Sequence, residues 1–191
     1  FLKGEADLLY AMAMQMNGRK ADAMEYLDQI LKGKNALNGV RETRILAGSA
    51  YILTLEGQLS EAWQFALQLQ EKAKKEHLLH TELWGVYLEA LISYYWNDLD
   101  RALHLCQHLL DYTFALHGGV VVDVEIIYVL IHFERNESEK VQESLEGLSE
   151  LSQHLNDSSN ILISSCQARL SMLSGHVEDA LIWLQESDQS I

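Results

Sequence analysis

The sequence of 191 residues contains no proline. At the usual frequency of about 5%, roughly ten prolines would be expected in a chain of this length. Sandwiches, barrels and other turn-rich folds use proline at strand edges and corners, whereas the interior of a helix excludes it. The absence of proline therefore disfavours these β folds and favours an all-helical protein.

Cysteine is also scarce, since Cys106 and Cys166 are the two in the chain. Two cysteines are too few for the disulfide framework of a small secreted protein and are typical of a reducing compartment. The sequence lacks an apolar run of about 18 residues and lacks the pattern of a signal peptide, so we expect no membrane association. Because the chain begins with Phe1 rather than methionine, we expect a piece of a longer cytoplasmic protein.

Basic residues are few, because 14 Lys and Arg stand against 28 Asp and Glu and leave a net charge of −14. A surface of this charge repels phosphate groups, which disfavours direct contact with nucleic acid or with an anionic membrane. Hydrophobic residues nevertheless make up 48% of the sequence. The chain can therefore bury a core, and disorder is not expected.

Five short segments of the sequence repeat at a spacing of 39 or 40 residues. Each ends in a small apolar anchor residue, namely Ala23, Ala62, Ala102, Val141 and Ala180. Five residues before each anchor stands a glycine or an asparagine: Gly18, Gly57, Asn97, Asn136 and Gly175. These two residue types best tolerate the left-handed backbone conformation that ends a helix. Each repeat is therefore predicted to be an antiparallel pair, with a helix A, a Gly or Asn turn and a helix B.

Stacking of about five such pairs predicts an all-α fold, a right-handed solenoid that forms one helical-repeat domain over residues 1–191. One stretch, Val120 to Ile127, is rich in β-branched residues and has the composition of a buried strand. The 39-residue register continues through it. We therefore expect a helix there as well.

Two stretches carry a family resemblance: ISYYWNDLDRAL from Ile92 to Leu103, and QARLSMLSGHVEDALIWL from Gln167 to Leu184. The helix-turn-helix repeat resembles the tetratricopeptide (TPR) class, although its period is longer than the 34 residues of that class and the closing proline is missing. The chain more closely resembles the helical-repeat region of MalT-like, LuxR-family transcriptional regulators. In that family a Tyr-x-Trp-Asn-Asp-Leu stretch and an Ala-Arg-Leu…Gly…Trp-Leu stretch recur in this order.

The resemblance implies a parent protein with an ATP-binding module before the repeats and a DNA-binding helix-turn-helix after them. In such regulators the repeat region receives the inducer or a regulatory protein. The 191 residues contain neither a phosphate-binding GxxxxGK[ST] loop nor a basic helix-turn-helix. ATP and DNA binding are thus expected of the flanking modules and not of this chain.

Two pairs of histidines have a sequence spacing that could suit the ligands of a metal ion. His104 and His108 stand four residues apart on a predicted helix, and His77 and His80 stand three apart. Neither pair has a third ligand fixed beside it, since Cys106 points to a different face from His104 and His108. We expect ordinary surface histidines, with no metal and no cofactor.

The remaining reactive groups also have structural explanations. Cys106 and Cys166 fall at apolar-periodic positions, where a buried, inert thiol is the expectation. The acid pair Glu178 and Asp179 lies at a predicted helix start, where carboxylates stabilise the helix dipole. We expect no catalytic site, and hence no enzyme.

Aromatic residues on the A helices form the candidate binding surface. In helix-pair repeats the A helices line the concave groove, and the register places six candidate ligand- or partner-binding residues there: Arg44, Tyr51, Trp84, Tyr87, Tyr94 and Phe133. Aromatic rings with hydroxyls and one arginine suit a sugar, a flat metabolite or a peptide. The alternative is that these rings pack between neighbouring repeats. Trp183, on the last B helix, is expected at an end face.

Two functions follow from this surface. The first is a regulatory or sensor domain that binds a small-molecule inducer or a protein partner in its concave groove. The alternative is a TPR-like scaffold for protein–protein interaction with no small ligand.

Overall fold

All secondary structure in the described residues is helical. The computed structural model describes residues 2–33, 39–153 and 157–188. The helices are α1 (Leu2–Met16), α2 (Lys20–Lys32), α3 (Gly39–Leu55), α4 (Leu59–Lys75), α5 (Leu79–Tyr95), α6 (Leu99–Leu110), η1 (Thr113–Ala115), α7 (Gly118–Glu134), α8 (Ser138–Ser152), α9 (Asp157–Leu173) and α10 (Val177–Asp188). The all-α prediction is confirmed. The β-branched stretch at Val120 lies inside α7, so the repeat register outweighs local propensity there.

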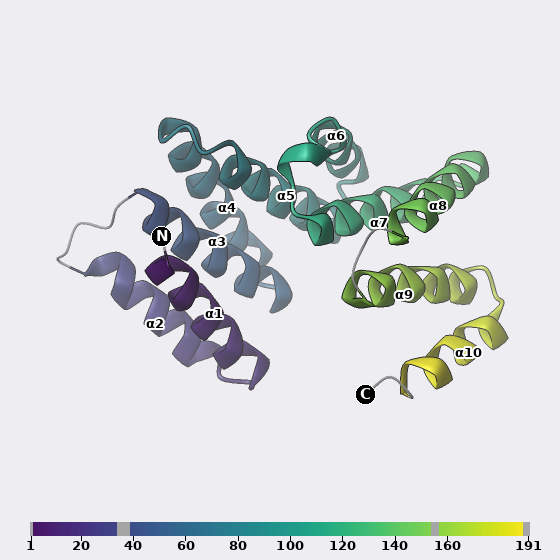
Figure 1. The fold of residues 1–191 in the computed structure, drawn as a ribbon, viewed down its shortest axis with the longest axis horizontal. Coiled ribbons are helices and arrows are strands. Elements are labelled where there is room, and N and C mark those ends of the chain that lie inside the picture. The colour runs from purple at the N-terminus through teal and green to yellow at the C-terminus, as the bar shows by residue number, and fades with distance from the viewer. Residues whose placement is uncertain (1, 34–38, 154–156, 189–191) are drawn as a thin grey trace. The chain divides into compact units, whose positions relative to one another are not determined.

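Consecutive helices pack against one another in two compact units, Phe1–Leu105 and Cys106–Ile191, which divide within α6. In the first unit α1 packs on α2 and α3, and both α3 and α4 pack on α5 (Figure 1). In the second unit α7 packs on α8 and α9, and α9 packs on α10. Odd-numbered helices are the A helices and even-numbered helices the B helices. The TPR-like pairing is confirmed within each unit, and the single domain over residues 1–191 stays a prediction.

Every turn from an A helix to a B helix has a left-handed residue at the predicted position. The φ angles are +72° at Gly18 and Gly57, +62° at Asn97, +57° at Asn136 and +84° at Gly175. At Gly57 the backbone N–H donates to the Thr54 carbonyl at 3.1 Å, and the next N–H, of Gln58, donates to Leu53 at 2.9 Å. This pair of bonds closes the last helical turn and recurs at all five positions. The Gly and Asn spacing in the sequence therefore marks the helix ends.

The core lies on the A helices. Ten of the 17 residues of α5 are buried, on nearly all sides of the helix. The B helix α4 instead buries one stripe of small and apolar residues at three- and four-residue spacing: Ala62, Ala66, Leu69 and Ala73. At Gly85 the backbone of α5 comes so close to α4 that a Cβ would lie 2.6 Å from Cγ of Gln70. A helices thus form the interior, and B helices present a polar face to water.

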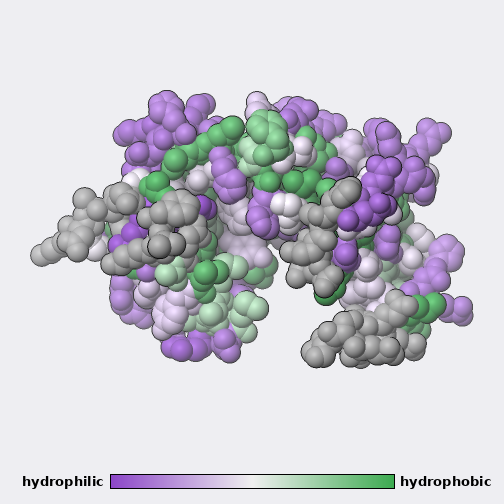
Figure 2. Space-filling view, viewed as in Figure 1, coloured by the Kyte–Doolittle hydropathy of each residue, from purple (hydrophilic) through white to green (hydrophobic). Residues whose placement is uncertain are grey.

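Hydrophilic side chains cover much of the face shown in Figure 2, with patches of hydrophobic side chains between them. Among the helices that the structure describes, none is both long and apolar enough to cross a membrane.

Candidate ligand-binding site

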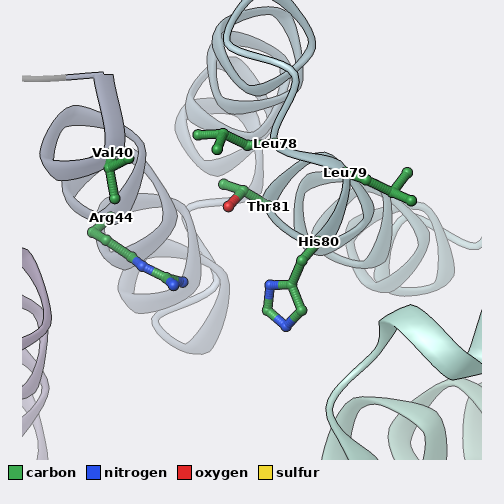
Figure 3. A pocket seen from close by; sticks show the side chains of 6 residues that line it. All are labelled: Val40, Arg44, Leu78, Leu79, His80 and Thr81. Atoms are coloured by element: carbon green, nitrogen blue, oxygen red, sulfur yellow. The ribbon is translucent and has the colours of Figure 1, made fainter. Parts of the chain in front are cut away.

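A pocket of about 430 Å³ opens between the first turns of α3 and α5. Val40 and Arg44 of α3 form one wall, and Leu78 to Thr81, at the start of α5, form the other (Figure 3). Both are A helices, so each follows a B helix and they run in the same direction. Their N-terminal ends therefore lie beside each other at one edge of the unit.

Polar groups from both walls meet in this pocket. Arg44 and His80 project into the space between the two helices (Figure 3). The side chain of Thr81 also lines the pocket, and Thr81 is only 8% exposed. Leu78 is the N-cap residue of α5 and provides no side-chain hydrogen bond to the first amides of the helix.

Among the side chains that the structure describes, those that line the pocket include no acidic one, although the chain as a whole is strongly acidic. Glu42, in the first turn of α3, forms an ion pair with Lys72 at 2.8 Å. The hydrogen bond to Glu42 raises the pKa of Lys72 above its ordinary value. Glu82, in the first turn of α5, lies outside the lining. The lining therefore combines one permanent cation, one imidazole, one hydroxyl and an apolar wall.

Of the six predicted binding residues, Arg44 lines the pocket. Trp84 and Tyr87 lie further along α5 with their ring centroids 5.7 Å apart, edge to face. Tyr87 is only 3% exposed, whereas Trp84 is half-buried and its Nε1 has no hydrogen-bond partner within the described residues. Trp84 and Tyr87 therefore contribute to the packing of α5.

The other three predicted residues lie apart from this pocket. Tyr51 is half-buried near the middle of α3, and Tyr94 lies near the C-terminal end of α5, where its ring centroid is 6.0 Å from that of Tyr95. Phe133 lies on α7, in the second unit. The pocket-lining residues His80 and Thr81 were missed as groove residues. The repeat register could have indicated His80, because it stands one turn before Trp84, which we had assigned to the groove.

A second, more apolar groove of about 340 Å³ lies between α9 and α10. It is lined by Ser165, Ala168, Arg169, Met172, Val177, Ala180, Leu181 and Trp183. Met172 is 60% exposed and Leu181 51% exposed. The last helix pair thus presents apolar side chains to solvent, including the tryptophan that the sequence placed at an end face.

The thiols of both cysteines are buried. Burial raises the pKa of Cys106 to about 12, with a further rise from the nearby Glu125 carboxylate. Burial also raises the pKa of Cys166, to about 11. Over the described residues, no group of three His, Cys, Asp or Glu side chains is arranged to hold a metal ion.

Stacked antiparallel helix pairs with a period of 39 or 40 residues define a helical-repeat protein of the TPR-like class. The family described as the MalT-like TPR region matches residues 2–191, and the chain belongs to it. No curated protein and no solved structure gives a significant match. The resemblance read from the sequence is confirmed. The chain is a helical-repeat region of the kind carried by MalT-type regulators, and such regions are typically non-catalytic.

Proposed function

We propose that the chain is the sensor region of a cytoplasmic MalT-type transcription regulator and that it binds a small-molecule inducer between α3 and α5. The observation that carries the proposal is the 430 Å³ pocket in a chain that matches the MalT-like TPR region over residues 2–191. Pockets for small ligands usually have volumes of about 300–1,000 Å³ and combine apolar walls with a few converging polar groups. Arg44, His80 and Thr81 supply those groups.

Binding at this position would regulate by bridging two neighbouring repeats. A ligand that contacts α3 and α5 together stabilises the arrangement of the two helices that fits it best. It can signal only if its affinity differs between two arrangements of the repeat region. The flanking ATP-binding and DNA-binding modules of the parent protein would respond to that difference, while the net charge of −14 disfavours contact between this chain and DNA.

A thermal-shift screen of the chain against sugars, nucleotides and small carboxylic acids tests the proposal. A ligand at about 100 times its dissociation constant adds about 2.7 kcal/mol of stability, which raises the midpoint by about 5–10 °C for a chain of this size. The variant His80→Trp places a larger ring in the space between α3 and α5, whereas Leu67→Trp changes an exposed leucine on α4 and is the control.

A shift that is lost in His80→Trp and kept in Leu67→Trp supports a sensor. If no compound raises the unfolding midpoint, or if both variants keep the shift, the result counts against a ligand in this pocket.

The groove between α9 and α10 favours a second candidate, a scaffold that binds protein without a small ligand. Its exposed Met172 and Leu181 would seat apolar side chains of a protein partner. A chain with this surface is expected to self-associate at high concentration, and Leu181→Lys should reverse that. A light-scattering mass that stays monomeric at high concentration argues against the scaffold.

A further inference from the structure

We propose that two copies of this chain associate head to tail, with α1 of one copy packed into the groove between α9 and α10 of the other. The inference does not depend on the inducer pocket. It identifies a second copy of the chain as the partner of the apolar groove, and it is carried by the way in which one repeat already receives the next within the chain.

The packing of α3 on the first helix pair shows how a repeat receives its neighbour. This helix contacts both α1 and α2 (Figure 1). One buried cluster joins the three helices: Ala11 of α1, Ala23 and Leu27 of α2, and Ile45 and Ile52 of α3. Small residues on the helix pair thus leave room for the branched side chains of the A helix that follows.

The groove between α9 and α10 is the counterpart of that receiving surface. It is lined by Ala168 and Ala180, which hold the register positions of Ala11 and Ala23 in the last repeat. The groove has a volume of about 340 Å³ and is otherwise mainly apolar. The surface that receives α3 in the first pair is therefore present in the last pair, where it forms an open groove.

The later A helices share a buried stripe at three register positions, spaced by three and four residues. The positions are Ile45, Gly48 and Ile52 in α3, Gly85, Leu88 and Ile92 in α5, Val124, Ile127 and Ile131 in α7, and Ile163, Cys166 and Leu170 in α9. All twelve residues are buried.

Two glycines of the stripe show which way it faces. A Cβ at Gly48 of α3 would lie 2.6 Å from Cδ1 of Leu8 on α1. A Cβ at Gly85 of α5 would lie 2.6 Å from Cγ of Gln70 on α4. In α3 and in α5 the stripe is therefore the face that packs on the preceding helix pair.

In α1 the same three positions are exposed. They are Ala6, Leu9 and Ala13, and Leu9 is 64% exposed. Met16 continues the stripe by one more turn and is 80% exposed. The first A helix thus presents to solvent the face with which an A helix packs on a helix pair. Docking of an apolar helix face into an apolar groove is a recurring mode of protein recognition.

The exposed stripe and the open groove match because they correspond to the two sides of one interface, which joins α3 to the first helix pair inside every copy. Two complementary surfaces at different places on one chain make a heterologous contact, through which one copy receives another. Contact between them removes apolar surface from water. The net charge of −14 on each copy opposes the association. Salt screens that repulsion, so the association is expected to strengthen with NaCl.

Sedimentation equilibrium over a range of protein concentrations, at low and at high NaCl, tests the inference. We expect the mass to rise above the 21.7 kDa of one chain, and to rise further at high salt. Leu9→Lys in the stripe and Leu181→Lys at the groove should each raise the dissociation constant by about tenfold or more, because each places a charge in an apolar contact. Both leucines are more than half exposed, so neither change disturbs the core.

Leu67→Lys is the matched control, because it makes the same change at an exposed leucine of α4 that belongs to neither surface. It should change the dissociation constant by less than about twofold. The helical circular dichroism of the three variants checks that each is folded.

An equimolar mixture of Leu9→Lys and Leu181→Lys tests the head-to-tail geometry. The first variant keeps its groove and the second keeps its stripe, so one intact interface can form between them. The mixture should therefore give dimers at concentrations at which each variant alone is monomeric, and it should give no larger species.

The inference is overturned if the mixture stays monomeric. It is also overturned if only one of the two lysine variants weakens association, because a head-to-tail contact uses both surfaces. Association that is weakened by Leu181→Lys alone would leave the groove as a site for another protein. A chain that is monomeric at every concentration and salt would remove both this inference and the scaffold candidate, and the inducer pocket would still be decided by the thermal-shift screen.

Discussion

The guanidinium of Arg101 donates two hydrogen bonds to one carboxylate oxygen of Glu89, from Nη2 at 2.5 Å and from Nε at 3.1 Å. The other oxygen of Glu89 accepts from Nε2 of Gln70 at 2.7 Å. Glu89 is buried in α5, while Gln70 lies on α4 and Arg101 near the start of α6. The guanidinium also lies 4.3 Å from the centroid of the Trp63 ring. One buried carboxylate thus links three consecutive helices.

Replacement of Arg101 by glutamine is expected to destabilise the first unit. The change leaves the Glu89 carboxylate buried with one strong donor fewer, and it removes the cation from the Trp63 ring. A hydrogen bond to a charged group contributes about 1.5–3 kcal/mol. Because the Arg101 side chain is 47% exposed, water replaces part of the lost hydrogen bonding. We therefore expect the free energy of unfolding to fall by about 1.5 kcal/mol, the lower end of that range. Urea unfolding measures it.

Arg19→Gln provides the comparison, since Arg19 and Asp22 form an exposed pair on α2. It should change the free energy of unfolding by less than about 0.5 kcal/mol. Equal losses in the two variants would mean that the buried carboxylate does not depend on its arginine.

Two glycine-to-alanine substitutions should change stability in opposite directions. Gly57 adopts φ +72° at the turn after α3, and Gly147 lies inside α8. No described atom comes within 4 Å of a Cβ built at either position, so the effects are those of the backbone alone. Gly57→Ala should cost about 1 kcal/mol through left-handed strain, and Gly147→Ala should add about 0.5–1 kcal/mol through helix propensity. Thermal unfolding of the two variants measures both effects. A stabilised Gly57→Ala would show that the turn relaxes out of its left-handed conformation.

The repeat could be predicted from the sequence because the same requirement, a residue that tolerates a left-handed backbone at the end of helix A, recurs five times. A single Gly57 would mark any turn, but glycine or asparagine in register at five positions marks helix ends. The same register overrides the β-branched residues of α7, since burial against neighbouring helices decides their conformation. His77, with φ +56° between α4 and α5, escaped prediction because it carries no left-handed preference as strong as that of glycine.

The binding surface was harder to predict, because exposure depends on packing between helices. The repeat register places both Tyr87 and Arg44 on the groove face of the A helices. In the structure Tyr87 is buried, whereas Arg44 lines the pocket. Likewise, the partners Glu89 and Arg101 stand 12 residues apart on different helices, and no local spacing rule links them.

Both cysteines should be inert toward alkylation in the folded chain. Burial raises the pKa of the Cys106 thiol from 9.0 to about 12, which lowers its thiolate fraction at pH 8 about a thousandfold. Burial raises the pKa of Cys166 to about 11. Iodoacetamide at pH 8, followed by mass spectrometry, should modify neither thiol in buffer and both in concentrated urea. Rapid modification of Cys106 in buffer would show that α6 opens around it.

A charged cluster at the turn from α7 to α8 predicts a pH-dependent contribution to stability. The Glu137 carboxylate accepts hydrogen bonds from Nζ of Lys140 at 3.0 Å and from Nδ1 of the fully buried His132. The ring of His132 in turn packs edge-on against Tyr128, with centroids 4.3 Å apart. The hydrogen bond from Lys140, followed by that from His132, lowers the pKa of Glu137 below its ordinary 4.5.

Because the pKa of Glu137 is lower in the folded state than in the unfolded state, its ionised form stabilises the fold. This contribution is complete above the ordinary pKa of 4.5, which the carboxyl has in the unfolded chain, and is lost as the pH falls through the lower, folded pKa. Glu137→Gln should therefore lower the urea midpoint at pH 7, and the gap to the unchanged chain should narrow below about pH 4. Glu139→Gln removes the same charge from an exposed residue at the same helix end and is the control. A gap that persists unchanged at pH 3, or one that Glu139→Gln reproduces, would mean that the ionised carboxylate is not what holds His132 in place.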